Sequence, residues 1–174
     1  MKRTLYLLST FALVLTFTTG AFAQTEVTAS TSIVADLVIA KKADLDFGQI
    51  SNSQTVDAVI DPQTGNSNTG STTTLGKITV DGSNGASITI SFSNPATLDK
   101  GTDTITFTGN YASNDTDDSS TSTDLDEGAA NTVTLDSTDG IEYIYLGGTL
   151  LGNDINGATV GAYTGTITVN ISYL

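Results

Sequence analysis

Carboxylates and tyrosines are almost the only side chains in this sequence that could carry acid–base or metal chemistry. The chain has 174 residues, with 19 Asp and Glu, 6 Lys and Arg, and no His, Cys or Trp. It therefore has no imidazole base, thiol nucleophile, Ser-His-Asp triad, disulfide, or thiolate or imidazole metal site. A net charge of −13 argues against binding nucleic acid through its phosphates. We expect a structural or binding protein rather than an enzyme, without a cofactor.

The densest group of carboxylates lies in a polar, acidic insertion near residues 110–131. Its members are Asp115, Asp117, Asp118, Asp124, Asp126 and Glu127. Calcium takes roughly six to eight oxygen ligands from loops of this kind, so these residues are the candidates for a calcium site. The spacing does not match an EF-hand, because no glycine stands at the sharp turn. The alternative is a solvated loop that charge repulsion holds open.

Two carboxylates, Asp44 and Asp46, have a spacing that a glycosidase pair could use. A sequence without Trp lacks the usual platform for a sugar, and a strand with its acids outward is the simpler interpretation. Leu45 and Phe47 would then point inward, and Gly48 would relieve a bend or bulge.

Three tyrosines, Tyr111, Tyr143 and Tyr145, could instead stack on a sugar at the surface. Alternation predicts that at least one of Tyr143 and Tyr145 belongs to the core.

Residues 1–23 are expected to be a secretory signal peptide. Lys2 and Arg3 are basic, residues 5–17 are mostly apolar, and residues 21–23 read Ala-Phe-Ala, a cleavage signature. The apolar run of about 13 residues is shorter than the roughly 20 that a membrane-spanning helix needs. We expect export through the periplasm to the cell surface or the medium. Loss of the two basic residues would change the net charge from −13 to −15.

The rest of the chain has the pattern of one all-β domain, residues 33–174. Short runs of alternating apolar and polar residues are separated by clusters of Gly, Asn, Asp and Ser. Strands are expected at 33–39, 44–48, 56–60, 78–80, 87–92, 104–108, 133–135, 141–146 and 163–173. A turn is expected at 61–65, and the glycines at 147 and 148 are expected to end a strand. The spacing predicts a single antiparallel β-sandwich of Ig-like or pilin-like type.

Apolar residues and one threonine occupy every second position from Val27 to Ile39. Extended, this stripe would be about 43 Å long, whereas a typical strand has about 5–6 residues. We expect the domain's first strand from about Ile33, preceded by an N-terminal extension at 24–32. Val27, Ala29, Thr31 and Ile33 would form one face of an arm that completes a neighbouring subunit's sheet. The alternatives are a disordered tail or a strand that closes its own domain.

The C-terminal residues form a long alternating stripe that ends at Tyr173, the penultimate residue. Gly161 lies fourteenth from the end. This arrangement resembles the C-terminal signature of chaperone–usher pilus subunits. The resemblance implies that the last strand borders an open groove and is the edge that the assembly chaperone reads. The residues expected there are Gly161, Tyr163, Ile167, Val169, Ile171 and Tyr173. The alternative is a sandwich that merely ends in an amphipathic strand.

A missing strand would matter energetically. Burying one aliphatic side chain contributes roughly 1.5–3 kcal/mol, so a groove that leaves four or five such contacts open loses roughly 6–15 kcal/mol. The whole stability of a domain is typically about 5–15 kcal/mol. Such a sandwich would be marginal until an arm or a chaperone filled it, and its open edge would invite aggregation.

Several segments together resemble the domain-of-unknown-function 4402 family of secreted bacterial proteins. They are residues 44–48, 61–65, 147–150 and the closing stripe 161–173. The resemblance implies a signal-bearing, pilin-like β-sandwich without an assigned activity. We therefore expect a structural subunit of a fimbria-like or pilus-like surface fibre, joined by strand complementation. Its implied partners are like subunits, a periplasmic chaperone and an outer-membrane usher. The alternative is a stand-alone adhesin or glycan-binding module that binds a host or surface glycan.

Overall fold

The structure is a computed structural model that describes residues 30–174. The expected signal peptide, and Val27 and Ala29 of the expected arm, lie outside the described residues. Residues Ile33–Leu174 form one compact unit. Within residues 30–174, no helix has the length and apolar character needed to cross a membrane.

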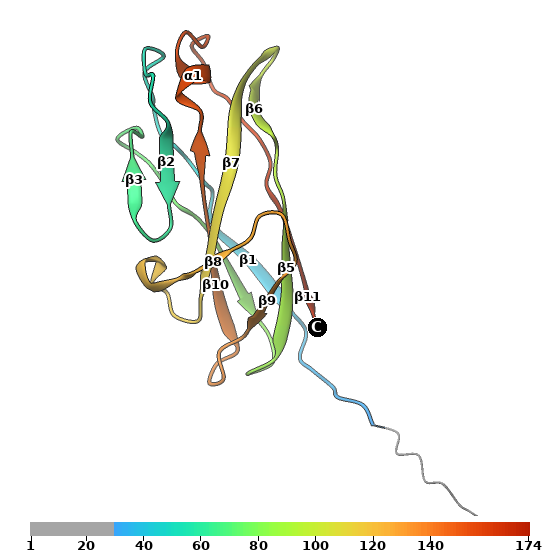
Figure 1. The fold of residues 1–174 in the computed structure, drawn as a ribbon. Helices are drawn as coiled ribbons and strands as arrows, with labels where there is room; N and C mark the ends of the chain where they lie inside the picture. The colour runs from blue at the N-terminus through green and yellow to red at the C-terminus, as the bar shows by residue number, and fades with distance from the viewer. Residues whose placement is uncertain (1–29) are drawn as a thin grey trace, which may run out of the picture. The chain divides into compact units, whose positions relative to one another are not determined.

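Two antiparallel sheets make up this unit as a β-sandwich, as the alternation predicts (Figure 1). The larger sheet contains β1 (Val38–Ala43), β4 (Gly76–Asp81), β10 (Ile141–Leu150), β2 (Ala58–Asp61), β3 (Gly65–Ser67), β7 (Asp103–Asn114), β6 (Thr97–Lys100) and β8 (Thr123–Leu125). The smaller sheet has the order β11 (Thr168–Tyr173), β5 (Ser87–Ser93), β9 (Asn131–Thr134). A 3₁₀ helix, η1 (Ser119–Thr121), and a short helix, α1 (Gly152–Ile155), lie in connections.

The central strand of the larger sheet is β10. Residues Tyr143–Leu150 pair with β7 on one side, and the opposite side pairs first with β4 and then with β2. Strands β4 and β5 follow the sequence pattern: their isoleucines and Val80 are buried, whereas the Thr, Ser and Lys residues between them are only half-buried. Since side chains alternate across a strand, this pattern places one face of each sheet against the other.

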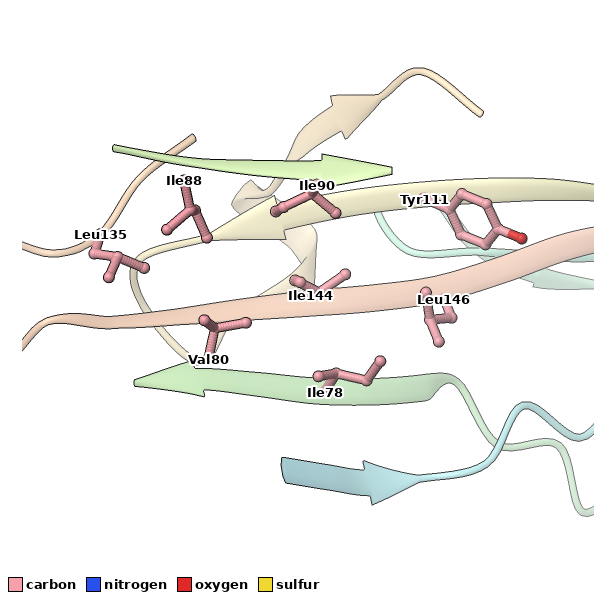
Figure 2. Packing of buried hydrophobic residues seen from close by; sticks show 8 residues of the cluster. All are labelled: Ile78, Val80, Ile88, Ile90, Tyr111, Leu135, Ile144 and Leu146. Atoms are coloured by element: carbon pink, nitrogen blue, oxygen red, sulfur yellow. The ribbon is translucent and has the colours of Figure 1, made fainter. Parts of the chain in front are cut away.

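The main core lies between the two sheets (Figure 2). The larger sheet contributes side chains from β4, β10 and β7, and the smaller sheet contributes two isoleucines of β5. The buried residues are Ile78, Val80, Ile88, Ile90, Tyr111, Leu135, Ile144 and Leu146. The ring of Tyr111 stacks on that of Phe92 with centroids 4.1 Å apart.

A second core cluster fills the other end of the larger sheet. Its buried members are Phe47, Ala58, Ile60, Ile105, Phe107, Leu150 and Ile155. Ile167 packs against both clusters and so links the two ends.

Several expected boundaries were wrong, among them the end of the strand expected at 104–108, which continues to Asn114 in β7. The first strand begins at Val38 rather than near Ile33, and residues 30–37 are not strand. The 44–48 segment has only an isolated bridge from Asp46 to Thr74, although Phe47 does point inward. The last strand covers only Thr168–Tyr173 of the expected 163–173, because residues before it bridge to β6 through Thr164 and Asp99.

Another wrong boundary is the glycine pair at 147 and 148. These residues lie inside β10 and do not end it. A Cβ atom at Gly148 would collide with the ring of Phe107, and one at Gly147 would collide with the carbonyl of Ile60. The two glycines therefore allow neighbouring groups to approach the strand backbone closely, which is a common reason for glycine inside a strand.

Candidate subunit-interaction site

The candidate site is formed by the two edge strands that lie on the same side of the sandwich. Among the described strands, β1 pairs with β4 alone and β11 pairs with β5 alone. Both strands therefore present an unpaired row of backbone N–H and C=O groups.

Side chains of β11 face the core but are incompletely covered. Val169, Ile171 and Tyr173 stand opposite Phe92, Ile90 and Ile88 of β5. Directly opposed residues point to the same face of a sheet. Ile88 and Ile90 have no exposed surface, whereas the three β11 residues are only half-buried. The difference arises because nothing in residues 30–174 pairs with the outer edge of β11.

Core-facing side chains on the β1 side are also incompletely buried. Ile39 stands opposite Val80, which is fully buried, yet 48% of the Ile39 surface is exposed. Leu37, two residues earlier, packs against the same core cluster and is half-buried. We call Leu37, Ile39, Val169, Ile171 and Tyr173 the β1–β11 seam.

Ser83 holds the two sides of the seam together at one end. Its backbone N–H donates to the Tyr173 hydroxyl at 2.8 Å, and its own hydroxyl accepts from the Ala35 N–H at 2.6 Å. The penultimate tyrosine and the segment leading into β1 thus meet at one residue. At the other end of β1, Lys41 forms an exposed ion pair with Asp44.

The other expected interaction residues are more dispersed. Thr31 and Ile33 are exposed, Ile33 to 93%. Gly161 has a φ of +152° and a Cβ there would meet the Lys100 side chain. Tyr163 packs on the second core and donates its hydroxyl to the Thr159 carbonyl at 2.9 Å. Gly161 and Tyr163 therefore lie toward the second core, away from the seam.

The acidic insertion is docked on the sandwich rather than held away from it. Asp117 forms an ion pair with Lys77 and accepts from the Tyr145 hydroxyl at 3.2 Å. The hydrogen bond from Lys77 above all, with the bond from Tyr145 and the Lys77 charge, holds the pKa of Asp117 below its usual value, although burial opposes it. The interpretation of residues 110–131 as an open loop was wrong, since β7 runs to Asn114 and β8 pairs with it.

The six candidate calcium ligands face different partners. Asp118 caps η1 through the Ser120 N–H, Asp126 accepts from the Gly128 N–H, and Glu127 accepts from Asn94. Asp115 and Asp124 line a separate opening beside β8. Throughout residues 30–174, no three carboxylates are gathered in an arrangement that could hold a metal ion.

The tyrosines considered for sugar stacking are mostly unavailable. Tyr111 is 1% exposed and Tyr145 is 3% exposed, which confirms that at least one of the pair Tyr143 and Tyr145 is buried. Tyr145 is covered by the insertion, and Tyr143 is half-buried with the Lys77 ammonium 5.2 Å from its ring centroid. Asp44 and Asp46 also have separate partners, Lys41 and the Gly48 N–H.

One buried acid was missed by the sequence reasoning. Glu142 of β10 is 3% exposed and faces the inter-sheet layer in phase with Ile144 and Leu146. Burial raises its pKa from 4.5 to about 7, opposed by the Ser113 side chain and increased by the charges of Asp115 and Asp136. The signal was its even spacing from two apolar core positions.

Comparison with known proteins identifies a family but no assigned function. No curated protein matches the chain. The model of the family described as "Domain of unknown function (DUF4402)" matches residues 37–173, which include all strands of both sheets and the whole β1–β11 seam. The chain therefore belongs to this domain-of-unknown-function 4402 family.

Proposed function

We propose that this protein is an exported structural subunit of a fimbria-like surface fibre, in which the N-terminal arm of one copy fills the β1–β11 seam of the next. The observation that carries the proposal is the seam itself. Two edge strands, one from each sheet, present core-facing apolar side chains that remain half-exposed. A strand added at this edge would pair with free backbone groups and cover those side chains.

The sequence supplies a segment suited to this position. Val27, Ala29 and Thr31 alternate with polar residues in the extension at 24–32. An added strand would place them on one face toward the seam and leave Glu26 and Thr28 toward solvent. Because the extension directly precedes the exposed segment that leads into β1, a copy whose seam is occupied still has its own arm to offer. Repetition of this step is head-to-tail and gives a fibre rather than a closed dimer.

The free energy expected from adding the arm is large enough to drive assembly. Each aliphatic side chain that becomes fully buried contributes roughly 1.5–3 kcal/mol, and the five seam residues are already part-covered, so we expect about half of that from each. New backbone hydrogen bonds add roughly 0.5–1.5 kcal/mol each. Together these favourable free energies exceed the entropy cost of ordering a short arm when most of the arm's inward face is apolar. Residues 27–31 have that pattern.

A charged substitution on the inward face of the arm tests the proposal. We expect Val27→Asp in the mature chain to weaken self-association by at least about 30-fold, because an aspartate placed against the seam is desolvated without a partner. Thr28→Asp is the matched control: it adds the same charge one position along, on the outward face, and is expected to change association less than about threefold. Analytical ultracentrifugation over a concentration series measures both.

Equal effects of the two variants would contradict the proposal, as would a mature wild-type chain that stays monomeric at all concentrations. That second outcome favours a stand-alone secreted module. The periplasmic chaperone and the outer-membrane usher are part of the same proposal, since an open seam needs cover during export. Genes for both beside this one would support their involvement.

A further inference from the structure

The sandwich has a second opening, between β8 of the larger sheet and β9 of the smaller one. Among the described strands, β8 pairs only with β7, and β9 pairs only with β5. A cavity of about 410 Å³ lies between them. Leu125 and Val133 are half-buried against the main core, so this opening, like the β1–β11 seam, reaches the apolar layer. We call it the β8–β9 opening.

Glu142 of β10 lies at the bottom of this opening. Its neighbours on the same face of β10 are core residues, and its opposite residue on β4, Val80, has no exposed surface. The strand therefore forces the carboxyl group into the inter-sheet layer, where only 3% of the residue is exposed. A charged carboxylate in such a place is costly unless a cation or several donors compensate it.

No cation compensates it. The four lysines of residues 30–174 are Lys41, Lys42, Lys77 and Lys100. The first two lie on β1 at the opposite edge of the larger sheet, and Lys100 lies on β6 beside Gly161. Lys77 is engaged with Asp117 and the ring of Tyr143, on the outer face of the sheet.

The charged groups around the opening are all acidic. Asp115 follows β7, Asp124 is on β8, and Asp136 follows β9. Asp139 precedes β10, Asp81 ends β4, and β5 has no charged residue. The side chains of Asp136 and Asp139 accept backbone N–H groups of their own turn. Every charge that faces Glu142 therefore repels its ionised form.

We propose that Glu142 is a pH switch built into the fold: when it is protonated, β8 and β9 are firmly held on either side of the β8–β9 opening, and when it ionises, water enters to solvate the carboxylate and these two edge strands loosen. Because β8 and β9 are short, ionisation of Glu142 can loosen them. β8 has three residues and β9 four, each held by a single neighbour.

The sign of the effect follows from proton linkage. Burial and the two aspartates raise the pKa of Glu142 from 4.5 in an unfolded chain to about 7 in the folded one. Between these values the folded state binds more protons than the unfolded state, so stability falls as pH rises through this range. The contribution is complete below about pH 4.5 and lost above about pH 7.

Glu142→Gln isolates the switch, because glutamine has the shape of the protonated acid and cannot ionise. We expect the mature wild type and the variant to melt at the same temperature near pH 4, and the variant to melt about 3–10 °C higher at pH 8.5. Hydrogen exchange of the β8 and β9 amides should speed up with pH in the wild type, beyond the intrinsic dependence, and should not do so in the variant. Asp99→Asn, which changes an exposed acid on β6 outside this opening, should keep the wild-type dependence of melting temperature on pH.

Direct titration provides the second measurement. The chain contains only three glutamates, Glu26, Glu127 and Glu142, so side-chain carboxyl carbon signals from ¹³C-glutamate labelling are few, and the variant assigns one of them. A midpoint near 7 for that signal supports the proposal. A midpoint near 4.5, a melting difference between wild type and variant that is constant with pH, or pH-independent exchange of β8 and β9 in the wild type would overturn it.

Discussion

Individual carboxylates in this acidic chain accept hydrogen bonds mainly from uncharged groups. Although burial opposes it, backbone N–H groups of Thr64 and Gln63 hold the pKa of Asp61 below its usual value, with help from Asn110. The Thr106 side chain and N–H do the same for Asp154. With only four lysines in the described part of the chain, backbone N–H groups and uncharged side chains replace cations as partners. Glu142 is different because a strand position offers it no turn N–H group.

A buried hydroxyl ties the insertion to the main core at the residue scale. The Tyr111 hydroxyl donates to Asn94, whose amide donates to Glu127. Burial, and then the Glu127 charge, raise the pKa of Tyr111. We expect Tyr111→Phe to destabilise the domain by about 0.5–1.5 kcal/mol, because the Asn94 carbonyl loses its donor while the ring stacking remains.

The control for this variant is Tyr143→Phe. The Tyr143 hydroxyl makes no hydrogen bond with residues 30–174, so its removal should change stability by less than about 0.5 kcal/mol. Urea denaturation measures the free energy of unfolding of both variants, and an unchanged m-value shows that only stability has changed. Equal losses would show that the bond to Asn94 contributes nothing specific.

At the scale of elements, β10 organises the fold. It pairs with β7 along one side and with both β4 and β2 along the other, and it contributes to both core clusters. Its glycine pair allows Phe107 and the Ile60 carbonyl to approach closely. The expectation that this pair ends the strand was reasonable from local propensity, but packing between strands overrode it.

Gly148→Ala tests this close approach. The added methyl group collides with the Phe107 ring, so we expect a loss of about 1–3 kcal/mol from overpacking. Gly128→Ala is the matched control, since the nearest atom to its added Cβ would lie at 3.6 Å. Chemical denaturation of the two variants compares them; a Gly148→Ala variant as stable as Gly128→Ala would contradict the packing argument.

For the whole molecule, the two openings of the sandwich differ in chemistry. The β1–β11 seam is lined by apolar side chains, whereas the β8–β9 opening contains Glu142 and rim aspartates. Inward-pointing charge disfavours strand addition at a sheet edge. The two edges are therefore unequal, which under the proposed function gives each subunit one acceptor side.

Thermal stability that depends on protein concentration is expected of the mature chain if copies complement one another. Each tenfold rise in concentration above the dissociation constant adds about 1.4 kcal/mol, or about 3–6 °C in melting temperature. Differential scanning calorimetry over a hundredfold range measures it. The Val27→Asp variant should show a melting temperature that does not move with concentration; a wild type that behaves in the same way contradicts intermolecular complementation.

The sequence by itself determined the β-sandwich, the inward phase of most strands and the membership of the family, because period-two alternation and turn residues are local signals. It also placed the turn at residues 61–65 and the apolar face of Val169, Ile171 and Tyr173. Only the tertiary structure decided where β1 and β11 begin, which carboxylates have partners, and that Glu142 is buried. These properties depend on which strands become neighbours, and pairing between distant segments leaves little trace in local composition.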